Sequence, residues 1–259
     1  MIDQKHFDIP NREELAQLNL QKIQKQMEKF KVDAVILNRS DNVRFVTGIM
    51  PTDNIIFTHR QAVLLIKGQS PILFACAHYT DYMKKDFWIK DVRPFPRVYQ
   101  AWAKQFHQAL EEFGVEKGVI ALDPYMFFSA SNLIRDKLKD ATIIDAGDLL
   151  FECRMIKNEE EIRTIDAACA IGEAALEDVM NYTKPGITEI ELSARLSYKC
   201  LLQGAEGLYA RRGSLACSGD RLAHHLNRQA GTEFAGESLS FWMLAQCIRV
   251  TILILQEQF

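Results

Sequence analysis

The chain has 259 residues and a formal net charge of −3, which argues against a protein that binds nucleic acid by general electrostatic attraction. Hydrophobic residues make up 48% and charged residues 25%, the balance of a globular protein that can bury one large core or two smaller ones. The six cysteines are scattered without Cys-x-x-Cys or zinc-site spacing, so we expect free thiols in a reducing compartment.

Two apolar signals that would change the protein class are absent from the sequence. The N-terminus begins Met1-Ile-Asp-Gln-Lys-His and has no apolar run of the kind found in a secretory signal. The apolar run 251–255 is bracketed by Arg249 and Gln256, which makes it too short to span a bilayer. We therefore expect a cytoplasmic protein with no membrane partner and no nucleic-acid partner.

The first half of the chain alternates short β-branched runs with helical patterns. Asn11 can cap a helix over residues 11–30, and the turn signal Lys67-Gly-Gln-Ser joins two strands into an antiparallel pair. The full set of expected elements is strands over 33–37, 45–48, 61–66, 71–76, 118–122 and 141–144, and helices over 99–113 and 129–138. This alternation predicts an α/β (α+β) domain with a mixed sheet.

A long amphipathic helix begins within the stretch Arg154–Glu161, where Asn158 is a plausible N-cap. We expect it to end near Tyr182, before the turn signal Lys184-Pro-Gly. Thr188 and Glu191 have the spacing of a capping box, which predicts a second helix that ends at Gly204. The junction of these two unlike halves divides the chain into domains over residues 1–150 and 151–241.

No residue of the first half carries chemistry by itself. His59, His78 and His107 stand in unlike contexts and are not expected to be ligands. Tyr99 and Trp102 could line a pocket, although aromatic spacing on a helix is more typical of a core. The sequence has no Gly-rich loop between a strand and a helix and no Gly-x-Ser-x-Gly, which leaves nucleotide binding and serine hydrolase chemistry without support.

Five short motifs occur in an order that resembles one known family. They are Asn42-Val-Arg-Phe-Val-Thr-Gly, Arg154-Met-Ile-Lys-Asn-Glu-Glu-Glu-Ile, Lys184-Pro-Gly-Ile-Thr-Glu, Cys217-Ser-Gly and Gly236-Glu. Over residues 12–241 this arrangement resembles the pita-bread metallohydrolases, which include creatinase, prolidase and aminopeptidase P. The resemblance implies a creatinase/prolidase N-terminal-like domain over residues 1–150 and a partial pita-bread catalytic domain over residues 151–241, as in a C-terminally truncated member.

The resemblance also implies a site for two divalent cations, manganese, cobalt or zinc, held by two aspartates, a histidine and two glutamates. A further histidine would assist proton transfer or substrate binding. This chain matches only that assisting histidine, at His225 or His224, and a pair of solvent-facing loop histidines is the alternative. The first aspartate ligand would stand at Trp242, which cannot bind a hard cation. We therefore expect no metal ligands and no cofactor in the chain as given.

The expected activity of an intact family member is metal-dependent hydrolysis of a C–N bond in a small peptide or small amide-like substrate, by an Xaa-Pro peptidase or creatinase mechanism in a homodimer. The chain as given is expected to be inactive. Two alternatives stay open. One is a lyase on the same fold, similar to the dimethylsulfoniopropionate lyases, and the other is a non-catalytic binding module.

The tail over residues 242–259 is expected to be aberrant, because the resemblance stops at Phe241. Trp and Met each have a single codon, so the last base of the Trp242 codon together with the first two bases of the Met243 codon spells an aspartate codon. The bases that follow permit a segment closing on Thr-Arg-Thr, which looks like the first metal-ligand segment of the family. A natural C-terminus with a short apolar strand is the alternative.

Our hypothesis is that residues 242–259 are read out of frame. We predict that repairing the reading frame at Phe241 replaces Trp242 by Asp and opens a longer coding region. The repaired protein should take up divalent metal, measured by elemental analysis, whereas the unrepaired chain should not. A coding sequence without an open frame past this point in the shifted register would end the hypothesis.

Overall fold

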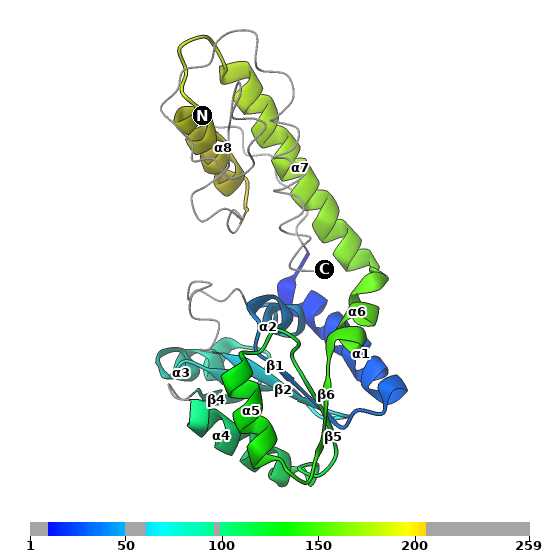
Figure 1. Cartoon of the computed structure of the whole chain (residues 1–259). Coiled ribbons are helices and arrows are strands. Elements are labelled where there is room, and N and C mark those ends of the chain that lie inside the picture. Colours follow the sequence, from blue (N-terminus) through cyan, green and yellow to red (C-terminus); the bar gives the residue numbers. More distant parts are fainter. Residues whose placement is uncertain (1–9, 50–60, 96–98, 206–259) are drawn as a thin grey trace. The chain divides into compact units, whose positions relative to one another are not determined.

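The computed structural model describes residues 10–49, 61–95 and 99–205 (Figure 1). Within them the chain forms two compact units, one over Asn11–Lys157 and one that begins at Asn158. The first unit contains α1 (Arg12–Phe30), β1 (Ala34–Leu37), α2 (Ser40–Thr47), β2 (Ala62–Ile66), β3 (Ile72–Ala75), α3 (Ala77–Asp86), β4 (Asp91–Pro94), α4 (Tyr99–Glu112), β5 (Val119–Leu122), α5 (Phe128–Lys137), β6 (Thr142–Asp145) and α6 (Gly147–Met155). The second unit contains α7 (Glu159–Tyr182) and α8 (Glu189–Leu202).

The strands of the first unit form one six-stranded sheet in the order β4-β3-β2-β1-β5-β6. Strand β2 runs antiparallel to both β1 and β3, whereas the pairs β1–β5, β3–β4 and β5–β6 are parallel. On β1, Val35 lies opposite Leu65 of β2 on one side and Ala121 of β5 on the other. The predicted α/β fold with a mixed sheet is confirmed.

Helices cover both faces of this sheet (Figure 1). Successive strand residues alternate between the two faces. Val35 and Leu37 belong to a core with α1, α2 and α6, and Ala34 and Ile36 belong to a second core with α4 and α5. Trp102 is 2% exposed in the second core, with its ring centroid 4.3 Å from that of Phe95. The expectation that Trp102 is a core residue is confirmed.

The strand predicted over residues 45–48 is wrong, because these residues end helix α2. A short apolar run does not show whether it is strand or helix from its periodicity alone. Here the Thr47 hydroxyl donates to the Val43 carbonyl (2.8 Å), a bond one helical turn back, and Gly48 ends the helix at φ 74°. The helices α3 and α6 and the strand β4 were not predicted.

The second unit is a pair of helices with a core of their own. Asn158 and Thr188 each cap a helix in a reciprocal capping box, with Glu161 and Glu191 as partners, which confirms both predicted starts. The turn between the helices contains Gly186 at φ 88°. The buried apolar residues shared by α7 and α8 are Ile171, Ala175, Leu176, Val179, Ile187, Leu192, Leu196 and Cys200. None of the helices among the described residues is both long and apolar enough for a membrane span.

Helix α6 determines where the first unit ends. Leu149, Leu150 and Cys153 are buried in the core that α1 and α2 share, and α6 packs along α1. The division between the two units therefore falls at Lys157/Asn158, after α6, whereas the sequence analysis places the end of the first domain at residue 150.

We predict that Gly48→Ala lowers the free energy of unfolding more than Gly68→Ala does. Both glycines have a left-handed backbone, at φ +74° and +73°, which costs an alanine about 1 kcal/mol. A Cβ at Gly48 would also lie 2.8 Å from the Arg12 carbonyl oxygen, whereas nothing lies within 4 Å of one at Gly68. Urea unfolding should give losses of about 2–3 and about 1 kcal/mol respectively. Equal losses of unfolding free energy in the two variants would show that the close contact with the Arg12 carbonyl adds no destabilisation.

Candidate functional site

The carboxyl ends of β1 and β5 are the place in this sheet where a ligand site is most expected. These two strands are parallel neighbours, but the chain leaves β1 toward β2 and leaves β5 toward β6, on opposite sides. In open α/β sheets the crevice at such a switch point is where ligands commonly bind. Here Asn38 follows β1 directly, and Asp123 follows β5 directly.

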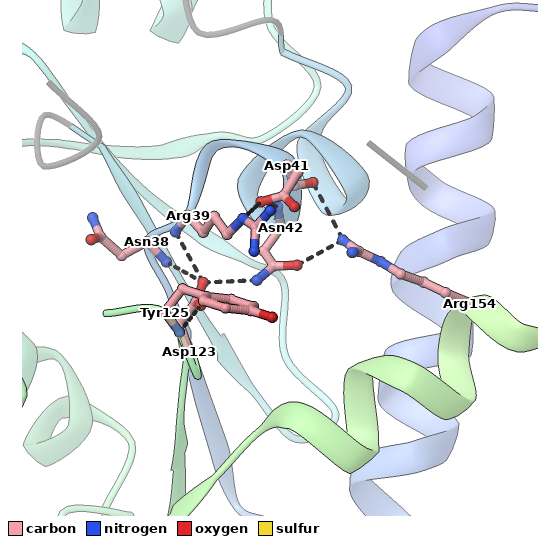
Figure 2. A network of polar contacts seen from close by, with 7 residues as sticks. All are labelled: Asn38, Arg39, Asp41, Asn42, Asp123, Tyr125 and Arg154. Carbon is pink, nitrogen blue, oxygen red and sulfur yellow. Dashed lines mark hydrogen bonds and ion pairs between the residues drawn. The ribbon is translucent and has the colours of Figure 1, made fainter. Parts of the chain in front are cut away.

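The Asp123 carboxylate lies at this switch point (Figure 2). Its Oδ2 accepts hydrogen bonds from the backbone N–H of Asn38 (3.1 Å) and Arg39 (2.9 Å) and from Nδ2 of Asn42 (2.9 Å). Its Oδ1 accepts from the backbone N–H of Tyr125 (3.1 Å), and the residue is 3% exposed. A carboxylate of the chain itself thus takes the position that a ligand anion would need.

Asn42 joins this carboxylate to a buried arginine of α6. While Nδ2 of Asn42 donates to Asp123, its Oδ1 accepts from Nη2 of Arg154 at 2.7 Å. Arg154 is 6% exposed, and its Cζ lies 4.7 Å from the ring centroid of Phe45, a cation–π distance. The two opposite charges therefore fix both the position and the orientation of the Asn42 amide.

The charges of this network compensate one another. Burial lowers the pKa of Arg154, and the Asp41 and Asp123 carboxylates oppose this effect, so the guanidinium stays charged. Burial likewise raises the pKa of Asp41, which the positive charges of Arg39 and Arg154 oppose. Two cations and two carboxylates are thus held together at the end of the sheet.

Arg39 and Tyr125 lie beside the network around Asp123 (Figure 2). Arg39 Nε lies 2.8 Å from Oδ1 of Asp41, and Arg39 Cζ lies 4.2 Å from the ring centroid of Tyr125. The Arg39 side chain is 42% exposed and Tyr125 is 70% exposed, whereas the Asp41 side chain is only 12% exposed. The guanidinium and the aromatic ring beneath it are therefore both partly exposed to solvent, whereas the carboxylate partner is largely buried.

The motif that begins at Arg154 connects the end of the first unit to α1 and α2. Arg154 itself bonds α2 through Asn42, and Nζ of Lys22 on α1 donates to the Ile156 carbonyl at 2.8 Å. Nζ of Lys157 donates to the Arg154 carbonyl at 2.6 Å, which satisfies an acceptor at the end of α6. The charged residues of this motif thus hold the last residues of the first unit in place.

The motif that begins at Asn42 is likewise built into contacts between elements. The Phe45 carbonyl accepts from Nδ2 of Asn19 on α1 (3.1 Å), and the Thr47 carbonyl accepts from the indole N–H of Trp88 (2.9 Å). Gly48 supplies the left-handed residue that ends α2. The contacts of this motif thus connect α2 with α1 and with the segment between α3 and β4.

The predicted site residues His224 and His225 lie outside the described residues, as do Trp242 and the motif residues Cys217 and Gly236. The sequence analysis singled out Asn42 and Arg154 only as parts of motifs. It missed Arg39, Asp41, Asp123 and Tyr125 altogether. The available signal was a polar residue directly after each of two buried strands, at Asn38 and Asp123.

The described residues of this site support the fold, because its carboxylates are already engaged by N–H donors or by Arg39. Within residues 10–49, 61–95 and 99–205, no group of three or more His, Cys, Asp or Glu side chains is arranged to hold a metal ion. The described residues thus do not fit the pair of cations that the resemblance implies.

Comparison with known proteins gives one family match and several relatives. The model of the Creatinase/Prolidase N-terminal domain matches residues 19–156. An Xaa-Pro dipeptidase of Pyrococcus horikoshii is 27% identical over 190 residues, 72% of this chain and 48% of that protein. The uncharacterized peptidase YqhT of Bacillus subtilis is 24% identical over 193 residues, 73% of this chain and 50% of that protein. The chain spans about half the length of these curated relatives.

The fold is similar to that of a solved X-Pro aminopeptidase of Thermotoga maritima. The TM-score is 0.68 at 21% identity, over 83% of this chain and 57% of that one. At this identity the likeness concerns the fold.

We predict that Asp123→Ala lowers the free energy of unfolding by about 3 kcal/mol, because four donors lose their acceptor and Arg154 loses a compensating charge. Added formate should restore part of this loss by binding in the vacated position, which urea unfolding with and without formate measures. Asp145→Ala is the matched control, since Asp145 ends the next strand but is exposed and accepts from the Gly147 N–H (2.6 Å). An equal formate response in both variants would contradict the assignment.

Proposed function

The chain belongs to the family defined by the Creatinase/Prolidase N-terminal domain, and from this premise we propose that the whole protein is a metal-dependent hydrolase of the Xaa-Pro peptidase type. The match over residues 19–156 confirms the resemblance deduced from the motifs, and it is the observation that carries the proposal. The relative from Pyrococcus horikoshii that bears the name Xaa-Pro dipeptidase supports the substrate class, a small peptide.

In this proposal the two units have different tasks. The first unit is the N-terminal domain, and α7 and α8 begin the catalytic domain. The metal ligands, which would bind two divalent cations of manganese, cobalt or zinc to activate water, come from outside the described residues. His225 or His224 is proposed as the assisting histidine. The whole protein is further proposed to be a cytoplasmic homodimer.

The network around Asp123 has a supporting task in this function. Through Arg154 it holds α6 on α2, and together with the bond from Lys22 to the Ile156 carbonyl this fixes the point from which the chain continues into α7. Arg154 and Asn42 are therefore positioning residues, which touch neither a substrate nor a metal in this proposal.

We predict that the chain as given binds no catalytic metal pair and hydrolyses no Xaa-Pro dipeptide, because Trp242 stands where the resemblance puts the first aspartate ligand. Elemental analysis of the purified chain and an assay with Xaa-Pro dipeptides measure this. A frame-repaired protein with Asp at that position provides the comparison, and it should gain both metal and activity.

About two equivalents of manganese, cobalt or zinc in the unrepaired chain would contradict the prediction. Turnover of dimethylsulfoniopropionate by the repaired protein, without dipeptide hydrolysis, would favour the lyase alternative. A repaired protein with neither metal nor turnover would favour a binding module.

A further inference from the structure

We propose that the outer edge of β6 is a self-association surface, on which β6 of a second copy of this chain pairs antiparallel and continues the sheet. Strand β6 (Thr142–Asp145) stands last in the sheet order, and among the strands that the structure describes it pairs only with β5 (Figure 1). The inference rests on the proposed function only for the homodimer, to which it adds a contact surface. It requires neither metal binding nor hydrolysis.

The backbone groups of β6 alternate between the two sides of the strand. The N–H of Thr142 donates to the Gly118 carbonyl at 3.0 Å, on the side of β5. Because successive residues of a strand point their N–H and C=O groups to opposite sides, those of Ile143 and Asp145 point away from β5. Such a row of outward N–H and C=O groups is where a further strand can pair.

The opposite edge of the sheet is protected, and β6 lacks the same protection. Natural sheets commonly blunt their edges with proline, lysine or a covering side chain. On β4, Pro94 has no N–H, and its carbonyl accepts from Nε2 of Gln105 at 3.1 Å. Strand β6 reads Thr-Ile-Ile-Asp, without proline or lysine, and its β-branched residues suit a paired strand. The edge that remains open to pairing is therefore β6.

A second copy of the chain fits this edge because β6 is self-complementary in an antiparallel register centred on Ile144. In that register the outward groups of Ile143 pair with those of Asp145 of the second copy, and the reverse pair forms by symmetry. Ile144 meets Ile144 of the second copy on the two-fold axis. Since Ile144 already packs against the core that α1, α2 and α6 share, this pair extends the apolar contacts of that face.

Charge complementarity favours the same register. Arg135 of α5 lies at this edge, where its Nη1 contacts the Ile143 carbonyl at 3.5 Å. Asp145 is two residues after Ile143, so both side chains lie on the face of the sheet that α5 covers. Asp145 of the second copy, opposite Ile143, therefore lies beside Arg135, and symmetry repeats this contact. Arg135 and Asp145 are both exposed, so their charges are accessible to a second copy.

The first test is sedimentation velocity of the chain as given over a concentration series, in which we expect a reversible monomer–dimer equilibrium. Arg135→Glu should weaken the dimer about tenfold, because two symmetric contacts change from attraction to repulsion. Lys137→Glu is the matched control, since it makes the same charge change at an exposed position of the same helix, on a different side. It should leave the dimer unchanged.

A charge exchange tests whether Arg135 and Asp145 meet across the interface. Asp145→Lys should weaken the dimer by a similar factor, and the combination of Arg135→Glu with Asp145→Lys should restore it, because the exchanged charges attract again. Urea unfolding checks that each variant is folded. If Asp145→Lys fails to fold, Arg135→Glu and amide exchange in the unmodified chain decide the matter.

Amide hydrogen exchange followed by NMR locates the surface directly. The amides of Ile143 and Asp145 should exchange more slowly at high chain concentration than at low concentration, because the second copy supplies their acceptors. The Thr142 amide, which already donates to the Gly118 carbonyl, is the internal control and should depend much less on concentration.

A chain that stays monomeric throughout the concentration series, or a dimer that Arg135→Glu leaves unchanged, would overturn the surface. A dimer without concentration-dependent protection at Ile143 would keep the homodimer and reject β6 as its contact. These results are separate from turnover. A frame-repaired protein that dimerises through β6 but hydrolyses nothing would keep the surface and reject the hydrolase.

Discussion

The first unit depends on a buried carboxylate and a buried guanidinium that one amide joins. Asp123 and Arg154 are 3% and 6% exposed, and Asn42 bonds both of them, at 2.9 and 2.7 Å. Two charges removed from water are costly unless hydrogen bonds and opposite charge compensate them. Here the carboxylate accepts four N–H donors, and the amide dipole points its N–H at the anion and its oxygen at the cation. The loop after β1, helix α2, the end of β5 and helix α6 are therefore held together by one connected network.

Two features of the unit follow from this network. The first is the position of the last residues before α7, since Arg154 holds α6 on α2 while Lys22 holds the Ile156 carbonyl. The second concerns the switch point between β1 and β5. The backbone N–H groups of Asn38 and Arg39, which could otherwise bind a ligand anion, already donate to Asp123. The same carboxylate thus stabilises the domain and leaves these backbone donors unavailable to a ligand.

The sequence alone predicts the features whose causes are local. The apolar runs of β1 and β5 predict strands, and the pairs Asn158–Glu161 and Thr188–Glu191 predict helix starts, because these signals act over a few residues. The run over residues 45–48 was assigned wrongly because it is too short to show a period. The role of Asp123 could not be predicted, because three of its four hydrogen-bond donors lie 81 to 85 positions away along the chain and meet it only through the parallel pairing of β1 with β5.

The most direct test of this account is a double-mutant cycle between Asp123→Ala and Arg154→Met, measured by urea unfolding. The two side chains share Asn42 as their common partner, so we expect a coupling free energy of about 1–2 kcal/mol, which should largely vanish in an Asn42→Ala background. Effects that add within about 0.5 kcal/mol would contradict the account, because they would show that the carboxylate and the guanidinium stabilise the domain independently.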